Sequence, residues 1–405
     1  MAKILISSLG TGQKREGGYR KAKYRYFDQT IETPFISKAL CSMLDIDRLY
    51  LIGTDGSIWD SVYKEFVDDS LYKEEIELQL YERIEEKSLS ADDLGTLEQT
   101  IDTSLHSAGS RCFLIDYGLD DTQLWQNFEK YLQILDCIED GDTVYIDISH
   151  AFRSLALMSF IMVQFGYTVK NKQFKIGGIF YGMLEAPSPD GTTPIVDLKI
   201  LYELMDWIKA IDNFKNYANG DNIAQLLKNI PEYRNEYNLF NNYTNAMRIA
   251  NMAAVKKNIQ TIARKFNTLE KSKNPIVTLM SEEMREFITR LNKDRMSDFQ
   301  LALAEWYCEH KHYALAYMAL AESIISKACE VKGYPVTAEE GRNSAKKAIY
   351  QIDKALANNV YRNVSKIRNN IAHQLQKRED AIIADIQNLP GYIQQTKGAF
   401  ASLQD

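Results

Sequence analysis

Two residues near the C-terminus have the side chains that RNA cleavage without a metal requires. Arg368 and His373 stand five positions apart in a stretch of helical periodicity, and Asn369 follows the arginine directly. A histidine moves protons near neutral pH, and a guanidinium holds a phosphate and the charge that develops on it. These actions are the ones needed when the 2′-OH of RNA attacks the adjacent phosphorus, and Asn369 can orient either group. The pattern is short, so an exposed arginine beside a capping or core histidine is the alternative interpretation.

One helix does not bring the arginine and the histidine together. Five positions on a regular helix correspond to a rotation of about 140°, so Arg368 and His373 do not share a face. Two copies of the helix, related by a two-fold axis, would supply both side chains to one site.

The segment around this motif is basic, although the chain is acidic. The formal net charge of −7 argues against a general nucleic-acid coat protein. Residues 341–380 nevertheless carry nine basic and three acidic side chains, a local charge of +6. Such a segment either attracts a phosphate chain or is an ordinary solvated helical surface. Glu322, on an expected helix from Tyr313 to Glu330, either faces the motif helix or is solvated or ion-paired elsewhere.

Polar residues also gather where apolar runs of the N-terminal half end. Asp147, Ser149 and His150 follow an expected strand, and Phe152 opens an apolar helix whose N-terminus can receive a phosphate. Ser149 is alternatively the N-cap of that helix. The loop at residues 8–12 has two glycines that allow close approach of a ligand, but it lacks the dinucleotide and P-loop spacings. Basic and aromatic residues after this loop either hold phosphates and stack on bases or lie on the surface: Lys14, Arg15, Tyr19, Arg20 and Tyr24.

Strand and helix patterns alternate in the first half of the chain. The expected strands lie at residues 3–8, 48–52, 112–116, 143–148 and 174–181, with helices over residues 122–135 and 152–165. Apolar strands separated by helices predict a mainly parallel, helix-covered sheet, which binds ligands at the C-terminal ends of its strands. After a Pro- and Gly-containing break near residues 186–200, only helical patterns follow. We therefore predict an α/β Rossmann-like domain over residues 1–197 and an all-α domain over residues 198–405.

The composition is that of a globular protein. Apolar residues make up 45% and charged residues 25% of the chain, and no apolar run reaches the roughly 18 residues that a membrane span needs. The five cysteines form no CxxC motif, and the histidines have no clustered partners, so we expect no metal site. The N-terminus enters a strand pattern without signal-peptide anatomy, and we expect a cytoplasmic protein.

The two halves together resemble a known architecture. The stretches at residues 6–12, 51–55, 147–154 and 180–186 resemble a CRISPR-associated Rossmann-fold (CARF) sensor domain, with Ala151 where the family has glycine. Arg368, Asn369 and His373 resemble the motif of a HEPN ribonuclease domain. Their order, over nearly the whole chain, resembles that of the CARF–HEPN ribonucleases of type III CRISPR systems.

The resemblance implies a homodimer whose CARF domains bind cyclic oligoadenylate and whose HEPN domains then cleave single-stranded RNA without a metal, leaving 2′,3′-cyclic phosphate ends. We expect cyclic tetra-adenylate rather than hexa-adenylate as the activator, no cofactor, no membrane contact and no stable place in an effector complex. Catalysis is assigned to Arg368, Asn369 and His373. The expected ligand-binding residues lie at the strand ends: Ser8, Leu9, Gly10, Thr11, Gly12, Thr54, Asp55, Asp147, Ser149, His150, Ala151, Phe152, Arg153, Ser154, Tyr181 and Met183.

Three other functions are weighed against this one. The first is a CARF sensor without catalysis that regulates a partner, and the second is a CARF protein that also degrades its activator. The third is a plain HEPN toxin, against which the large N-terminal domain argues.

Overall fold

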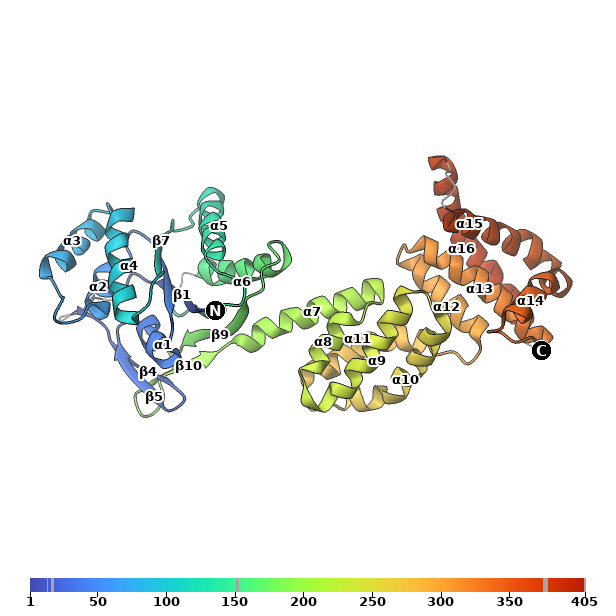
Figure 1. Ribbon diagram of the computed structural model, residues 1–405, viewed down its shortest axis with the longest axis horizontal. Coiled ribbons are helices and arrows are strands. Elements are labelled where there is room, and N and C mark those ends of the chain that lie inside the picture. Colours follow the sequence, from blue (N-terminus) through green and yellow to red (C-terminus); the bar gives the residue numbers. More distant parts are fainter. Residues whose placement is uncertain (13, 16–17, 151–152, 374–377, 404–405) are drawn as a thin grey trace. The chain divides into compact units, whose positions relative to one another are not determined.

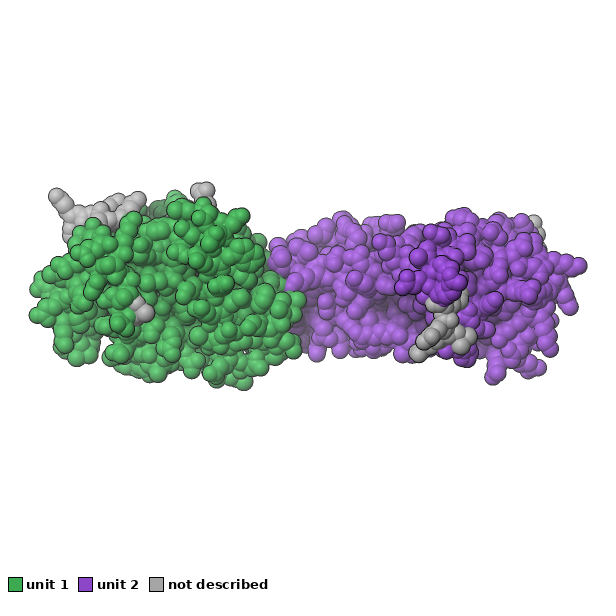
Figure 2. All heavy atoms as spheres, turned by 90° about the horizontal axis from the view of Figure 1, so that it is seen from above, with its two compact units in different colours: residues 1–203 green, residues 204–405 purple. Residues whose placement is uncertain are grey.

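The chain folds into two compact units. The computed structural model describes residues 1–12, 14–15, 18–150, 153–373 and 378–403 (Figure 1). The units comprise Met1–Glu203 and Leu204–Asp405 (Figure 2). The division falls inside helix α7 (Lys199–Tyr217), a few residues after the boundary predicted from the sequence.

The N-terminal unit is built on one large sheet. Its strands are arranged in the order β5-β4-β10-β9-β8-β1-β6-β7. The five strands from β9 to β7 are mutually parallel, whereas β10 is antiparallel to β9, and β4 is antiparallel to β5. The strand bounds are β1 (Lys3–Leu9), β4 (Ala22–Tyr26), β5 (Gln29–Thr33), β6 (Arg48–Gly53), β7 (Arg111–Leu114), β8 (Thr143–Asp147), β9 (Lys175–Gly182) and β10 (Thr193–Asp197).

Helices cover both faces of this sheet (Figure 1). Alternate side chains of β1 enter two different cores: Leu5 and Leu9 pack with α1, α2 and α4, whereas Ile4 and Ile6 pack with α5 and α6. A strand buried on both faces is apolar along its whole length, which is why β1, β6 and β8 stand out in the sequence. The helices are α1 (Ile36–Leu44), α2 (Trp59–Phe66), α3 (Glu74–Glu85), α4 (Ala91–Leu105), α5 (Asp121–Asp136) and α6 (Arg153–Thr168).

The strands that the sequence patterns did not predict lie in the antiparallel part of the sheet. Strands β4 and β5 form a hairpin of mixed polarity, and β10 lies within the Pro- and Gly-containing break. A small separate hairpin pairs β2 (Lys14–Arg15) with β3 (Gly18–Tyr19). The predicted fold class, an α/β Rossmann-like unit with a mainly parallel sheet, is confirmed.

The C-terminal unit is helical, as predicted. One continuous apolar core joins its helices from α7 onward. A π-helical turn, Leu356–Tyr361, comes directly before α15. Among the described residues, none of the helices is both long and apolar enough to span a membrane. The further helices are α8 (Asp221–Lys228), α9 (Arg234–Arg248), α10 (Met252–Glu270), α11 (Pro275–Leu291), α12 (Met296–Glu309), α13 (Tyr313–Lys332), α14 (Glu339–Ile352), α15 (Arg362–Ala372) and α16 (Glu379–Ser402).

Candidate ligand pocket and candidate catalytic helix

The loops after β1, β6 and β8 meet at one edge of the sheet. These strands run parallel, so their C-terminal ends lie side by side. The β6–α2 loop is fastened to the β1 loop by two hydrogen bonds: Ser57 Oγ donates to the Leu9 carbonyl at 2.8 Å, and the Ile58 N–H donates to the Gly10 carbonyl at 3.1 Å. The loops therefore form one continuous rim.

A cavity of about 500 Å³ opens at this rim. Its walls combine the backbone of the β1 loop with three aromatic rings and two charged side chains. The lining residues are Leu9, Gly10, Thr11, Gly12, Tyr19, Arg20, Tyr24, Pro34, Phe35, Ile58, His150, Leu184 and Glu185. Aromatic faces, backbone N–H groups and an arginine are the groups that bases and phosphates of a nucleotide require.

Asp147 fixes the loop that follows β8. Its buried carboxylate accepts hydrogen bonds from Ser7 Oγ at 2.6 Å, from Ser149 Oγ at 2.5 Å and from the Ser149 N–H at 2.9 Å. Ser149 Oγ in turn accepts from the Gly182 N–H at 2.7 Å, which ties the loop to β9. Ser149 thus contacts Asp147 and β9, and α6 is described from Arg153 onward.

His150 lies in the cavity wall beside Tyr24. The distance from His150 Nε2 to the Tyr24 hydroxyl is 3.3 Å. Burial lowers the pKa of His150, against the opposing effect of Asp147, and favours the neutral imidazole. Burial also raises the pKa of Asp147 and the pKa of Tyr24. The His150–Tyr24 pair is therefore mainly an uncharged, hydrogen-bonding surface at neutral pH.

Gly12 has a backbone conformation and surroundings that fit only a residue without a side chain. Its φ of +66° lies in the left-handed region, and an added Cβ would stand 2.6 Å from Cδ1 of Tyr19 and 2.8 Å from Cγ2 of Ile58. Only glycine fits both the conformation and the space.

The structure separates the sequence-predicted ligand residues into groups. Leu9, Gly10, Thr11, Gly12 and His150 line the cavity. Ser8, Thr54 and Asp147 are buried, and Asp55 is half-buried on the turn after β6. Ala151 and Phe152 lie outside the described residues, and only the backbone of Arg153 is described, at the start of α6. The others are half-buried near the rim rather than in the wall: Ser149, Ser154, Tyr181 and Met183.

Several wall residues were not identified from the sequence. Pro34 and Phe35 come from the β5–α1 connection, which follows a hairpin that the patterns did not reveal. Leu184 and Glu185 lie two and three residues after the end of β9, and Tyr181 donates from its hydroxyl to Glu185 at 3.0 Å. Their place after a parallel strand was the signal that could have identified them.

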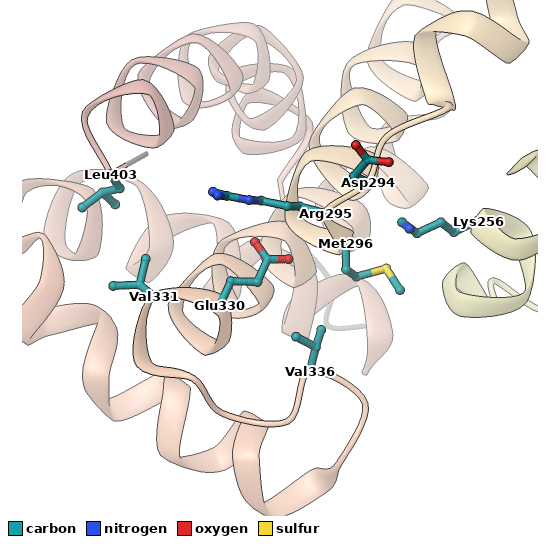
Figure 3. A pocket seen from close by; sticks show the side chains of 8 residues that line it. All are labelled: Lys256, Asp294, Arg295, Met296, Glu330, Val331, Val336 and Leu403. Carbon is teal, nitrogen blue, oxygen red and sulfur yellow. The ribbon is translucent and has the colours of Figure 1, made fainter. Parts of the chain in front are cut away.

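The C-terminal unit has a hollow of its own, with a volume of about 550 Å³ (Figure 3). The side chains of Arg295 and Glu330 point into it, and Lys256 and Asp294 add one further charge of each sign. Glu330 accepts hydrogen bonds from the N–H and the hydroxyl of Ser297, so its carboxylate caps the start of α12. None of the sequence-predicted catalytic residues lies in this hollow.

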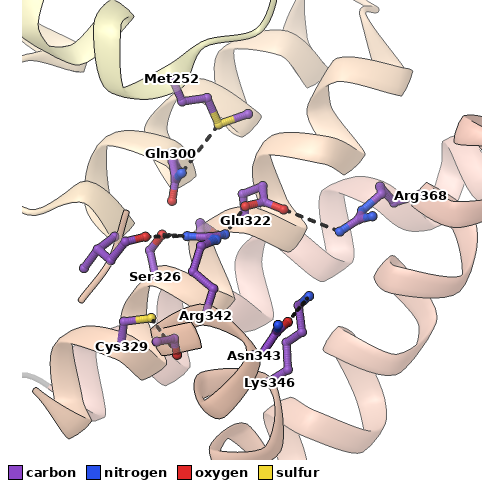
Figure 4. Close-up of polar contacts among 12 residues, drawn as sticks. Met252, Gln300, Glu322, Ser326, Cys329, Arg342, Asn343, Lys346 and Arg368 are labelled. Atoms are coloured by element: carbon purple, nitrogen blue, oxygen red, sulfur yellow. Dashed lines mark hydrogen bonds and ion pairs between the residues drawn. The ribbon is translucent and has the colours of Figure 1, made fainter. Parts of the chain in front are cut away.

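Helix α15 carries the predicted catalytic residues, and they differ in environment. Arg368 is half-buried, and its Nη2 lies 3.4 Å from Glu322 on α13 (Figure 4). Its Nη1 donates to Asn369 Oδ1 at 3.1 Å. Asn369 and His373 are exposed, and His373 follows the last residue of the helix. Within the described part of the chain, no hydrogen bond joins the Arg368 and His373 side chains. The expectation that Glu322 faces the motif helix is confirmed.

Possible metal ligands do not converge in the described ranges. Groups of three or more histidine, cysteine, aspartate or glutamate side chains placed to hold an ion are absent there.

Comparison with known proteins places the N-terminal unit in a family. Residues 4–185 match the CARF domain of the CRISPR system endoribonuclease Csx1, and residues 203–298 match the second domain of the CRISPR-associated protein MJ1674. The CRISPR-associated protein MJ1674 of Methanocaldococcus jannaschii is 29% identical over 401 residues, which cover 92% of this chain and 62% of that protein. The chain thus spans less than two thirds of this relative's length.

A solved structure of Csm6 from Enterococcus italicus, bound to cyclic hexa-2′-fluoro-hexa-dAMP, aligns with 100% of this chain and 94% of its own, at 11% identity and a TM-score of 0.44. Both matched family ranges end before Arg368. They cover the sheet apart from β10, the cavity at its edge and the first helices of the C-terminal unit. The N-terminal unit thus matches a CARF domain over most of its length, and the chain is similar to a CRISPR-associated protein.

Proposed function

We propose that this protein is an endoribonuclease that cleaves single-stranded RNA when its CARF domain binds cyclic oligoadenylate. The observation that carries the proposal is that one chain combines a domain able to bind a nucleotide with residues able to cleave RNA. A CARF domain has a cavity suited to nucleotides, and a separate helical unit carries Arg368 and Asn369 on α15 and an exposed His373 directly after it. The sensor and the chemistry then reside in different units.

The cleavage chemistry is a transesterification within the RNA. The 2′-oxygen forms a bond to phosphorus as the bond to the 5′-oxygen breaks. One His373 takes the proton of the 2′-OH, and the His373 of a second copy gives a proton to the leaving 5′-oxygen. Arg368 holds the phosphate and stabilises the charge on the five-coordinate phosphorus. The products are a 2′,3′-cyclic phosphate and a 5′-OH, and the nucleophile comes from the substrate itself.

The cavity of the CARF domain suits an adenine nucleotide. Tyr19, Tyr24 and Phe35 offer ring faces for stacking, and the backbone of residues 10–12 offers N–H groups to a phosphate. Arg20 is the cation of the wall and is exposed to solvent. We propose cyclic tetra-adenylate as the ring that two such cavities hold.

Replacing Arg20 with alanine is expected to weaken activator binding about tenfold to a hundredfold, because a hydrogen bond to a charged group contributes about 1.5–3 kcal/mol. Isothermal titration calorimetry with cyclic tetra-adenylate measures the change. Lys23→Ala, on the neighbouring strand but outside the cavity wall, is the control and should bind as wild type does. An Arg20→Ala affinity equal to that of the control would place the activator phosphates elsewhere.

An exposed apolar surface supports a homodimer. Leu157 and Ile161 stand one helical turn apart on α6, and the first turn of α7 adds two more apolar side chains. Their exposed fractions are 67% for Leu157, 53% for Ile161, 59% for Ile200 and 48% for Leu201. The two helices are in contact, since the Phe160 and Tyr202 ring centroids lie 6.4 Å apart. We name these four residues the α6–α7 patch and propose that a second copy covers it.

The proposed function is tested by cleavage of a labelled RNA strand with each cyclic oligoadenylate in turn, in the presence and absence of EDTA. We expect activator-dependent cleavage that EDTA does not inhibit and products that end in 2′,3′-cyclic phosphate, because the 2′-OH is the nucleophile. Cleavage that requires a divalent ion and leaves 3′-OH ends would contradict the mechanism.

A sensor without catalysis is the second candidate. The ion pair of Arg368 with Glu322 favours it, because an arginine held in such a pair can have a purely structural role. The absence of cleavage with every cyclic oligoadenylate, together with tight binding of one of them, would support this candidate.

A further inference from the structure

We propose that Glu322 is a positioning residue, which sets the place of the Arg368 guanidinium for RNA cleavage and is itself held in place by Arg342. This inference rests on the proposed ribonuclease function. It assigns a role to residues of α13 and α14 that lie outside the Arg368–His373 motif.

The contacts form a chain across three helices (Figure 4). One Glu322 oxygen, Oε1, lies 3.4 Å from Arg368 Nη2, and the other oxygen is ion-paired with Arg342. Arg342 has two further contacts: Nη1 donates to the Val336 carbonyl at 3.0 Å and to Ser326 Oγ at 3.4 Å. Arg342 is therefore tied to the α13–α14 connection and to α13 itself.

Partial burial gives this chain of contacts more weight than a surface ion pair has. The side chains of Glu322 and Arg368 are each 30% exposed and that of Arg342 is 20% exposed. Charges that are partly shielded from water are screened less than exposed ones. Glu322 lies on α13, which is buried along most of its length, including Ser323 and Ser326 near Glu322 in the sequence, so the packing of this helix holds its backbone in place. Glu322 thus stands on a fixed support when it contacts Arg368.

The charges leave Arg368 able to bind a phosphate. One carboxylate lies between two guanidinium groups, so the cluster keeps a net positive charge. Arg368 has five N–H donors, of which the contacts to Glu322 and Asn369 each occupy one. As far as contacts between described residues go, the remaining donors are open to RNA. Glu322 can therefore orient the Arg368 guanidinium while the cluster stays positively charged. A masking residue would instead cancel the charge that Arg368 offers to the phosphate.

The two roles predict opposite effects of Glu322→Gln. If Glu322 positions Arg368, the substitution lowers the rate of the chemical step, since Arg342 and Arg368 then repel each other without a carboxylate between them. If Glu322 instead masks Arg368, removing the negative charge raises the activity. The sign of the change therefore decides between them.

The experiment compares activated RNA cleavage by wild type and by Glu322→Gln at saturating activator. We expect kcat to fall about tenfold to a hundredfold, the effect of losing a hydrogen bond between charged groups. The KM for RNA should change far less, because the remaining donors and the basic segment still bind the strand. Glu309→Gln breaks an ion pair with Arg290 in the same unit and is the matched control. It should retain wild-type kcat.

A double-mutant cycle tests whether Glu322 acts through Arg368. Arg368→Lys keeps the charge and loses the planar fork, so Glu322→Gln should cause little further loss in that background. Arg342→Lys is the second variant, in case Glu322→Gln does not fold, and should also lower kcat while leaving activator affinity unchanged. Thermal unfolding of each variant shows whether the unit is folded at the assay temperature.

The outcomes separate this inference from the function on which it rests. Suppose that wild type cleaves RNA and Arg368→Ala does not, but that Glu322→Gln and Arg342→Lys match wild type. The positioning role of Glu322 is then wrong, while the ribonuclease function stands. Activity above wild type in Glu322→Gln would overturn it in favour of masking. If wild type shows no activated cleavage, the proposed ribonuclease function fails first, and the inference fails with it.

Discussion

Replacement of His373 by alanine is expected to abolish activated RNA cleavage and to leave activator binding intact. A positioned proton-transfer group contributes about a hundredfold to ten-thousandfold to a rate, and two copies of His373 serve as base and acid in the proposed mechanism. The loss should therefore reach the upper end of that range or exceed it. Cleavage of a labelled RNA strand gives the rate, and calorimetry with cyclic tetra-adenylate gives the affinity.

The environment of His373 makes this substitution a clean test. His373 is exposed after the last turn of α15, so the alanine leaves no cavity in the core. His106→Asn is the matched control: His106 is also exposed, but it lies in the N-terminal unit and has a positive φ that asparagine tolerates. The control should cleave RNA as wild type does. Near-normal cleavage by His373→Ala would remove the central claim about the catalytic helix.

The parallel part of the sheet could be predicted from the sequence because its strands are buried on both faces. The predicted runs at residues 3–8, 48–52 and 143–148 are mostly apolar, and each matches its observed strand to within a residue. The β4–β5 hairpin gave no such signal. Its strands carry Lys23, Arg25 and Glu32 among apolar residues, since much of their surface is exposed. Partial burial breaks the periodicity on which such predictions depend.

The sequence indicated where the candidate ligand pocket lies better than it indicated which side chains line it. Polar loops at the ends of parallel strands indicated the edge of the sheet where the cavity opens. Which side chains reach the cavity depends on hydrogen bonds that no pattern reveals. Asp147 and Ser149 have the chemistry of ligand contacts, yet their polar atoms are occupied by Ser7 and Gly182. Phe35 enters the wall only because the β4–β5 hairpin folds against β10.

The candidate catalytic helix, α15, is similar: its residue types could be recognised in the sequence, but their contacts could not. The spacing of Arg368 and His373 was visible in the sequence, where contact of Glu322 with the motif helix was one of two alternatives for that residue. The role of Arg342 was not visible, because its two contacts to Val336 and Ser326 depend on the path of the α13–α14 connection. A turn of this kind has no periodic signature.

Mixing of subunits is expected to show that the ribonuclease site is shared between two chains. Wild type mixed with a ninefold excess of His373→Ala protein should retain about one tenth of the activity of the same amount of wild type diluted in buffer. With random pairing, only about one wild-type chain in ten finds a wild-type partner, and a heterodimer supplies a single histidine to a site that needs two. The measurement is the initial cleavage rate after the mixture has re-equilibrated at saturating activator.

The geometry of α15 is the reason for this expectation. A rotation of about 140° between Arg368 and His373 directs them to different sides of the helix, and the structure leaves His373 exposed while Arg368 contacts α13. A two-fold axis would let the exposed histidines of two chains approach the same phosphate. It would also explain control by a ligand in another unit, because the activator need only change how the two copies are placed.

A mixing partner that cannot dimerise gives the matched control. His373→Ala combined with Leu157→Glu and Ile161→Glu carries two charges in the α6–α7 patch, and the buried charge should prevent pairing. The ninefold excess of this triple variant should leave wild-type activity unchanged, and light scattering should show it as a monomer. Equal inhibition by both partners would mean competition for RNA or activator. Wild-type activity that neither partner changes, although heterodimers form, would mean that each chain holds a complete site. Arg368 and His373 of one chain would then reach the same phosphate through a rearrangement of α15.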